Sequence, residues 1–133
     1  GISMRDRERV VRECKFELGV LEKLAGSLAQ AATLQAAGNL KGALNSLNHA
    51  LGLDPPNIAH ATTVRCARAE VHLQRGTLFS AGDDAKRALA SADRLQQCDA
   101  HRPWATLGRV AFQRGAFATA IANLTEAVLR LDA

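Results

Sequence analysis

Apolar residues recur at helical spacing along the whole chain, in stretches that are separated by glycine or proline. No proline occurs before Pro55, so the pattern predicts one long helix from about residue 5 to residue 37. Gly19 and Gly26 within it cost only about 1 kcal/mol each relative to alanine. Acidic and basic side chains alternate through its first half, which is typical of a solvated helix face. The apolar stripe of that half consists of Val10, Val11, Cys14, Leu18 and Leu21.

The rest of the chain predicts shorter helices. Proline is confined to the expected helix boundaries, where Pro55 and Pro56 end one helix and Pro103 suits the first turn of another. Aliphatic residues and alanine dominate and aromatic residues are few. This balance predicts an all-α chain, and 133 residues suit one domain. The further helices are expected over residues 40–53, 58–75, 78–97, 103–114 and 116–131.

One pattern of small residues occurs three times. Counted from a turn glycine, a small residue lies seven positions before it, and alanines lie five and twelve positions after it. Small side chains let two antiparallel helices approach closely, and glycine permits the turn between them. Because one helix pair cannot bury its apolar face alone, three copies predict a stacked α-solenoid. The three sets are Ala31/Gly38/Ala43/Ala50, Ala69/Gly76/Ala81/Ala88 and Gly108/Gly115/Ala120/Ala127.

This motif resembles the tetratricopeptide repeat (TPR) family. The resemblance implies a right-handed α-solenoid of three TPR helix pairs with a long N-terminal helix. The chain departs from the family in having no tyrosine inside the pairs, and its turn glycines lie 38 and 39 residues apart instead of the usual 34. The resemblance is clearest in the third copy, where signature positions are occupied by Trp104, Leu107, Gly108, Gly115, Phe117, Ala120, Ile121 and Ala127.

The repeat register divides the chain. Residues 1–3 resemble a cloning scar, and residues 4–23 form either an N-terminal cap or the remnant of an upstream repeat. The three repeats are expected over 24–61, 62–100 and 101–133. An apolar stripe left exposed on residues 5–23 would invite self-association, so this segment is a candidate surface for oligomerisation.

Composition limits the partners and the cellular locations that we expect. The net charge of +4 permits acidic partners, but the arginines are spread without a dense cluster, which argues against nucleic-acid binding. The three cysteines are widely spaced, which favours reduced thiols and a cytoplasmic location, although a disulfide between two of them stays open. No apolar run reaches the roughly 20 residues that a membrane span needs.

Motifs for catalysis are missing from the sequence. It contains no nucleophile elbow, no phosphate-binding glycine loop and no His-Glu-x-x-His zinc motif. No two of its four histidines are separated by four residues, the spacing that places two ligands on one helix face. We therefore expect no enzyme, no metal site and no cofactor.

The family resemblance implies a binding surface, because the first helix of each pair lines the concave side of the solenoid. The residues that the register assigns to this groove are mostly small or apolar. Such a groove suits an apolar peptide or an amphipathic helix, with Arg102 or Arg109 pairing an acidic residue of the ligand. The candidate partner-binding residues are Leu28, Ala32, Gln35, Cys66, Glu70, Leu73, Arg102, Thr106, Arg109 and Phe112.

One well-known subclass of the family is not matched. Members that hold the acidic tails of the Hsp70 and Hsp90 chaperones use a clamp of Lys, Asn and Arg side chains. Leucine and alanine cannot donate the hydrogen bonds that a carboxylate requires, so only Arg102 fits and we expect no clamp. The matching positions are Leu28, Ala32, Ala67, Arg102 and Thr106.

A second subclass fits better. The long first helix and the extra residues after Pro55 resemble TPR proteins that carry a C-terminal J domain. Those proteins are co-chaperones that bind unfolded chains and hand them to Hsp70, and some work in the endoplasmic reticulum lumen. The expected function is therefore protein binding of the chaperone or co-chaperone type. The alternative is an assembly scaffold that associates through the N-terminal helix.

Overall fold

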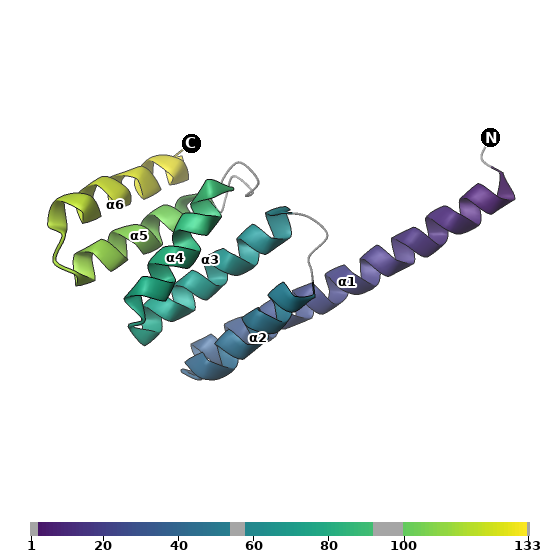
Figure 1. The fold of residues 1–133 in the computed structure, drawn as a ribbon, viewed down its shortest axis with the longest axis horizontal. Coiled ribbons are helices and arrows are strands. Elements are labelled where there is room, and N and C mark those ends of the chain that lie inside the picture. Colours follow the sequence, from purple (N-terminus) through teal and green to yellow (C-terminus); the bar gives the residue numbers. More distant parts are fainter. Residues whose placement is uncertain (1–2, 54–57, 92–99, 133) are drawn as a thin grey trace.

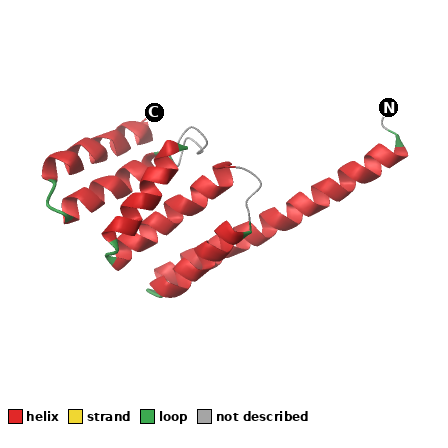
Figure 2. Ribbon diagram, in the orientation of Figure 1, coloured by secondary structure: helices red, strands yellow, loops and turns green. Residues whose placement is uncertain are grey.

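The computed structural model describes residues 3–53, 58–91 and 100–132. Every regular element within these residues is an α-helix (Figure 2), which confirms the all-α prediction. The helices are α1 (Met4–Ala36), α2 (Leu40–Gly52), α3 (Ile58–Arg75), α4 (Leu78–Ala90), α5 (His101–Gln113) and α6 (Phe117–Asp132).

The helix ends follow the local signals closely. The long first helix is confirmed, and α3 has the bounds that the sequence predicted. The α4 helix ends at Ala90, with Ser91 in a turn, and the predicted continuation over 92–97 lies outside the described residues. Pro103 lies in the first turn of α5, where its missing N–H removes no helical hydrogen bond.

The three glycine turns share one geometry. Gly38, Gly76 and Gly115 have φ angles of 83°, 82° and 78°, in the left-handed region that glycine adopts without strain. In each turn the amide after the glycine donates to the carbonyl five residues earlier, as in a Schellman motif. The predicted role of these glycines is confirmed. The bonds join Asn39 N to Leu34 O (2.8 Å), Thr77 N to His72 O (2.9 Å) and Ala116 N to Ala111 O (2.9 Å).

The small residues that repeat with the turns are buried. Ala43, Ala81 and Ala120, five positions after the glycines, are at most 3% exposed. The alanines twelve positions after the glycines and the small residues seven positions before them are buried as well. Each helix of a pair therefore presents alanine or glycine to its neighbour, as the repeat pattern predicted.

Consecutive helices pack on one another (Figure 1). The most extensive contacts join α1 with α2, α3 with α4 and α5 with α6. Smaller contacts join α2 with α3 and α4 with α5, and α3 also contacts α5. The chain thus forms three helix pairs in sequence order, each contacting the next.

The main apolar core lies where the first pair meets α3. Its partly buried border includes Ala67 and also Leu28, which the sequence assigned to the groove. By contrast, residues 4–18 of α1 are all exposed, and this half of the helix projects away from the other helices (Figure 1). The expected exposure of the N-terminal apolar stripe is confirmed. The buried core residues are Leu24, Ala31, Ala43, Leu44, Leu47, Ala50, Val64 and Val71.

Candidate functional site

The ten predicted partner-binding residues come from the first helix of each pair, namely α1, α3 and α5. Eight of them are at least partly accessible. Ala32, Arg109 and Phe112 are exposed, while Leu28, Gln35, Glu70, Leu73 and Arg102 are partly buried. We refer to these eight residues as the first-helix face.

Two side-chain contacts join residues of the first-helix face to a neighbouring helix pair. Gln35 Nε2 of α1 donates to Gln74 Oε1 of α3 at 3.0 Å. Arg102 of α5 donates from Nε and Nη2 to the two carboxylate oxygens of Glu70 in α3, at 2.7 and 2.9 Å. Of the predicted residues, Arg102 and Glu70 are therefore brought together, and Gln35 lies beside α3.

The Arg102–Glu70 contact also changes the charge of this face. Its two parallel bonds have the fork geometry of a strong arginine–carboxylate pair, and both side chains are less than one-third exposed. An acidic ligand would have to compete with Glu70 for the Arg102 guanidinium. Arg109 is exposed about two turns further along α5, and it is accessible to an acidic group without such competition.

Cys66 and Thr106 are not available on the first-helix face. Each is 1% exposed. Cys66 packs with Ala88, so it lies between α3 and the second helix of its own pair. Thr106 occupies the repeat position of Ala67, which borders the core against the preceding pair. Neither side chain reaches a surface that a partner could contact. We therefore exclude Cys66 and Thr106 from the proposed contact residues.

The structure reveals a polar cluster that sequence reasoning missed. Arg68 of α3 donates from Nε and Nη2 to both carboxylate oxygens of Asp84 in α4, each at 2.7 Å. Arg68 Nη1 also donates to Asn48 Oδ1 of α2 at 3.1 Å, so this side chain joins three helices. Because both Asp84 oxygens already accept hydrogen bonds, the arrangement holds helices together and offers no free general base.

His72 borders this cluster. Its Nε2 atom lies 3.9 Å from Asp84 Oδ2, and its buried Nδ1 atom makes no hydrogen bond. Desolvation lowers the pKa of His72 below its usual value, while the nearby Asp84 carboxylate opposes the shift. The hydrogen bonds that Arg68 donates to Asp84 raise the pKa of Arg68. Near neutral pH the cluster therefore contains a charged arginine and a neutral histidine.

One signal in the sequence does point to this cluster. Asp84 lies three residues after Ala81 and four before Ala88, on the alanine face of α4 that packs against α3. A carboxylate on such a face needs a buried partner. The adjacent Asp83 is on the accessible side and pairs with Arg87 at 3.2 Å.

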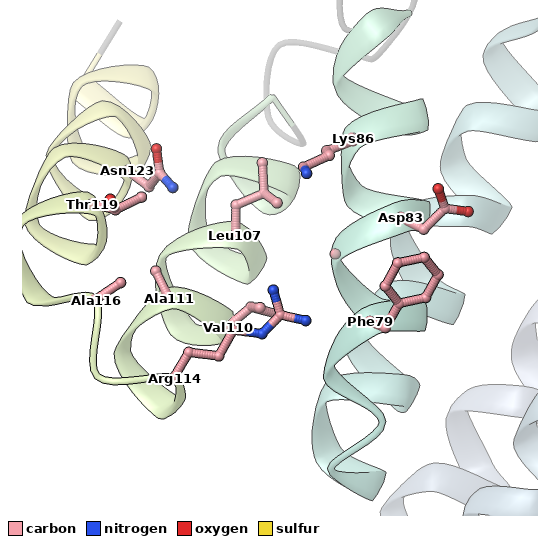
Figure 3. Close-up of a pocket in the computed structure, with 11 residues that line it drawn as sticks. Phe79, Asp83, Lys86, Leu107, Val110, Ala111, Arg114, Ala116, Thr119 and Asn123 are labelled. Carbon is pink, nitrogen blue, oxygen red and sulfur yellow. The ribbon is translucent and has the colours of Figure 1, made fainter.

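A separate hollow lies between α4, α5 and α6 (Figure 3). Leu107 and Val110 of α5 form its apolar floor, and its volume is about 350 Å³. Lys86 of α4 and Arg114 of α5 contribute positive charge at its edge. This hollow is distinct from the first-helix face, because none of the eight residues of that face lines it.

Metal sites and membrane spans can be assessed for the described residues only. Among residues 3–53, 58–91 and 100–132, no three His, Cys, Asp or Glu side chains lie close enough together to hold a metal ion. The helices in this part of the chain are too short or too polar to cross a membrane. In comparisons with known proteins, no family model, no curated protein and no solved structure matched the chain.

Proposed function

We propose that this chain is a protein-binding module built as a right-handed solenoid of three TPR-like helix pairs, with a partner peptide or helix bound on the first-helix face. The observation that carries the proposal is a pair of side-chain contacts between neighbouring helix pairs, Gln35 with Gln74 and Arg102 with Glu70. They join α1 to α3 and α3 to α5, which supports one continuous surface over the three helices. A surface that spans three helices suits an extended or helical segment better than a small molecule.

The chemistry of the face indicates the class of ligand. Ala32, Leu73 and Phe112 offer apolar contact, and Phe112 is 61% exposed. The ring of Phe112 also lies 5.9 Å from that of Phe117, which extends the apolar area toward α6. Arg109 supplies an accessible positive charge beside it. The ligand is therefore a segment with bulky apolar side chains and an acidic residue placed to reach Arg109.

An unfolded polypeptide exposes segments of this kind, so the proposal includes work as a chaperone or co-chaperone. The clamp chemistry that reads a free terminal carboxylate has no counterpart here, because Leu28 and Ala32 replace its donors. Recognition then depends on internal apolar residues of the partner. A connection to Hsp70 would have to come from a further domain or subunit.

Selection from a random-peptide display library, followed by titration of the selected peptide, tests the proposal. Ala32→Glu and Arg109→Glu alter two exposed positions, so they should weaken binding without unfolding the chain. Leu28 is less suitable, since it packs against the main core. Lys86→Glu is the matched control, because it reverses one charge at the hollow of Figure 3. If only Lys86→Glu weakened binding, the site would be the hollow and the first-helix face would be excluded.

The exposed half of α1 supports a second candidate, an assembly scaffold. Val11, Leu18 and Leu21 are between 38% and 55% exposed in the described part of the chain. Pairing this half with another helix would bury the stripe. Light scattering on chains that begin at Met4 and at Leu24 tests this candidate, because it predicts association for the longer chain only. Equal masses for both chains would refute it.

A further inference from the structure

The outer face of α6 carries four large apolar side chains in a row. Phe117, Ile121, Leu124 and Val128 follow one another at intervals of four, three and four residues, which places them on one side of the helix. Their exposed fractions are 62%, 67%, 37% and 55%. We call these four residues the α6 stripe. A shallow hollow lined by Ile121, Leu124, Thr125 and Val128 runs along it.

The same repeat positions are covered in the other two pairs. Counted from the turn glycine, the stripe occupies positions two, six, nine and thirteen. In α2 these are leucines that are buried or partly buried, and they pack in one core with Val64 and Val71 of α3. In α4 a Cβ atom on Gly82, at position six, would lie 4.0 Å from Val110 of α5. The α2 residues are Leu40, Leu44, Leu47 and Leu51.

In the first two pairs, these positions are covered by another helix of the same chain. It is the first helix of the following pair, which contributes residues twelve, nine and five positions before its own turn glycine. In α3 these residues are Val64, Ala67 and Val71. The α6 stripe has the same layout, but no following pair within the described residues covers it.

The opposite end of the array leaves the complementary face uncovered. In α1 the residues twelve, nine and five positions before Gly38 are Gly26, Ala29 and Thr33, and all three are exposed. The Thr33 hydroxyl already donates to Ala29 O at 3.0 Å, so burying it leaves no donor unpaired. Small residues here match the bulky residues of the α6 stripe, as the small and bulky faces of adjacent pairs match inside a packed core.

We infer that copies of this chain stack end to end, with the Gly26–Ala29–Thr33 face of α1 in one copy covering the α6 stripe of another. The occupant is a second copy because one chain carries both halves of the contact, in the register that α2 and α3 already use. The contact is heterologous, so a dimer still has one free face at each end. Association should therefore continue past the dimer as concentration rises.

Single substitutions on each face test the inference. Ile121→Glu places a charge in the centre of the stripe, and Ala29→Arg places a long charged side chain on the opposing face. Each should weaken association by at least about tenfold, because the new charge is buried without a partner. Ala122→Glu is the control on α6, since Ala122 is exposed but points away from the stripe. Sedimentation velocity over a concentration series measures the masses, and circular dichroism verifies that each variant is folded.

A mixture of the two variants gives the decisive result. The Ile121→Glu chain keeps its α1 face and the Ala29→Arg chain keeps its α6 stripe, so together they should form a dimer that grows no further. Each variant alone should remain a monomer, while the wild type and Ala122→Glu should grow past the dimer. Dimers of Ala29→Arg alone would indicate pairing of two α6 stripes and overturn the inference. Wild-type-like association of Ile121→Glu, or a monomeric wild type at all concentrations, would overturn it as well.

Discussion

Gly108 of α5 lies against Leu124 of α6 so closely that a Cβ atom on the glycine would be 2.7 Å from Leu124 Cγ and 3.2 Å from its backbone nitrogen. The equivalent positions in the other pairs hold alanine, at Ala31 and Ala69. The third pair is therefore the one in which the first helix approaches the second closely enough to exclude a methyl group.

Gly108→Ala should destabilise the chain. The added methyl group meets both a side chain and the backbone, so overpacking of about 1–3 kcal/mol outweighs the gain in helix propensity of about 1 kcal/mol. Urea unfolding measures the difference. Gly19→Ala is the control, because nothing lies within 4 Å of a Cβ atom there and its stability should be equal or higher. Equal stability of the two variants would show that α5 and α6 separate easily.

The turn glycines give a second prediction. Gly76→Ala forces an alanine into a φ of 82°, which should lower the free energy of unfolding by about 1–2 kcal/mol. Gly76→Asn should cost less, because asparagine tolerates the left-handed region better. Thermal unfolding of the two variants compares them. If Gly76→Asn were the less stable variant, left-handed strain would not be the cause.

Asp84→Asn should lower the free energy of unfolding by about 2 kcal/mol, because it leaves the Arg68 charge in a partly buried site without its carboxylate. The side chain of Asp84 is only 5% exposed, and that of Arg68 is 21% exposed. Asp83→Asn is the neighbouring control. It breaks an exposed pair with Arg87 and should cost less than about 1 kcal/mol. A similar cost for both variants would mean that burial of the Arg68–Asp84 pair contributes nothing.

His72 predicts a dependence of stability on pH. The pKa of His72 in the folded chain is below the ordinary 6.5. As the pH falls through 6.5, His72 therefore binds a proton in the unfolded chain before it does so in the folded chain. The contribution of neutral His72 is therefore fully present above about pH 6.5 and is lost as the pH falls toward the folded pKa. His72→Gln should flatten this part of the stability profile. Urea unfolding at several pH values measures both profiles, and an unchanged slope in the variant would contradict the assignment.

The helices and turns could be predicted because their signals are local. Proline and the apolar spacing indicated the ends of α2 and α3, and glycine at positions 38, 76 and 115 marked the turns. The alanine positions followed too, because close helix packing restricts side-chain size. These features depend on neighbours within a few residues, which the sequence displays directly.

The partners of individual side chains could not be predicted in this way. Arg68 meets Asp84 and Asn48, which are 16 and 20 residues distant, and periodicity does not specify such pairs. The assignment of Cys66 and Thr106 to the groove failed for a related reason. Neighbouring residues on a helix are separated by about 100° of rotation. A small error in the assumed orientation of the helix therefore moves a residue at the edge of the predicted face from the surface into the contact between helices.

The order of contacts among the three pairs determines where the molecule should begin to unfold. The α3–α4 pair has a neighbour on both sides, whereas α6 and the projecting half of α1 each end the row. Unfolding should start at these two ends of the row and progress inward, because each of them lacks a neighbour on one side. Amide hydrogen exchange should then be slowest in the middle pair, around Val64 and Ala85, and fastest along residues 4–18.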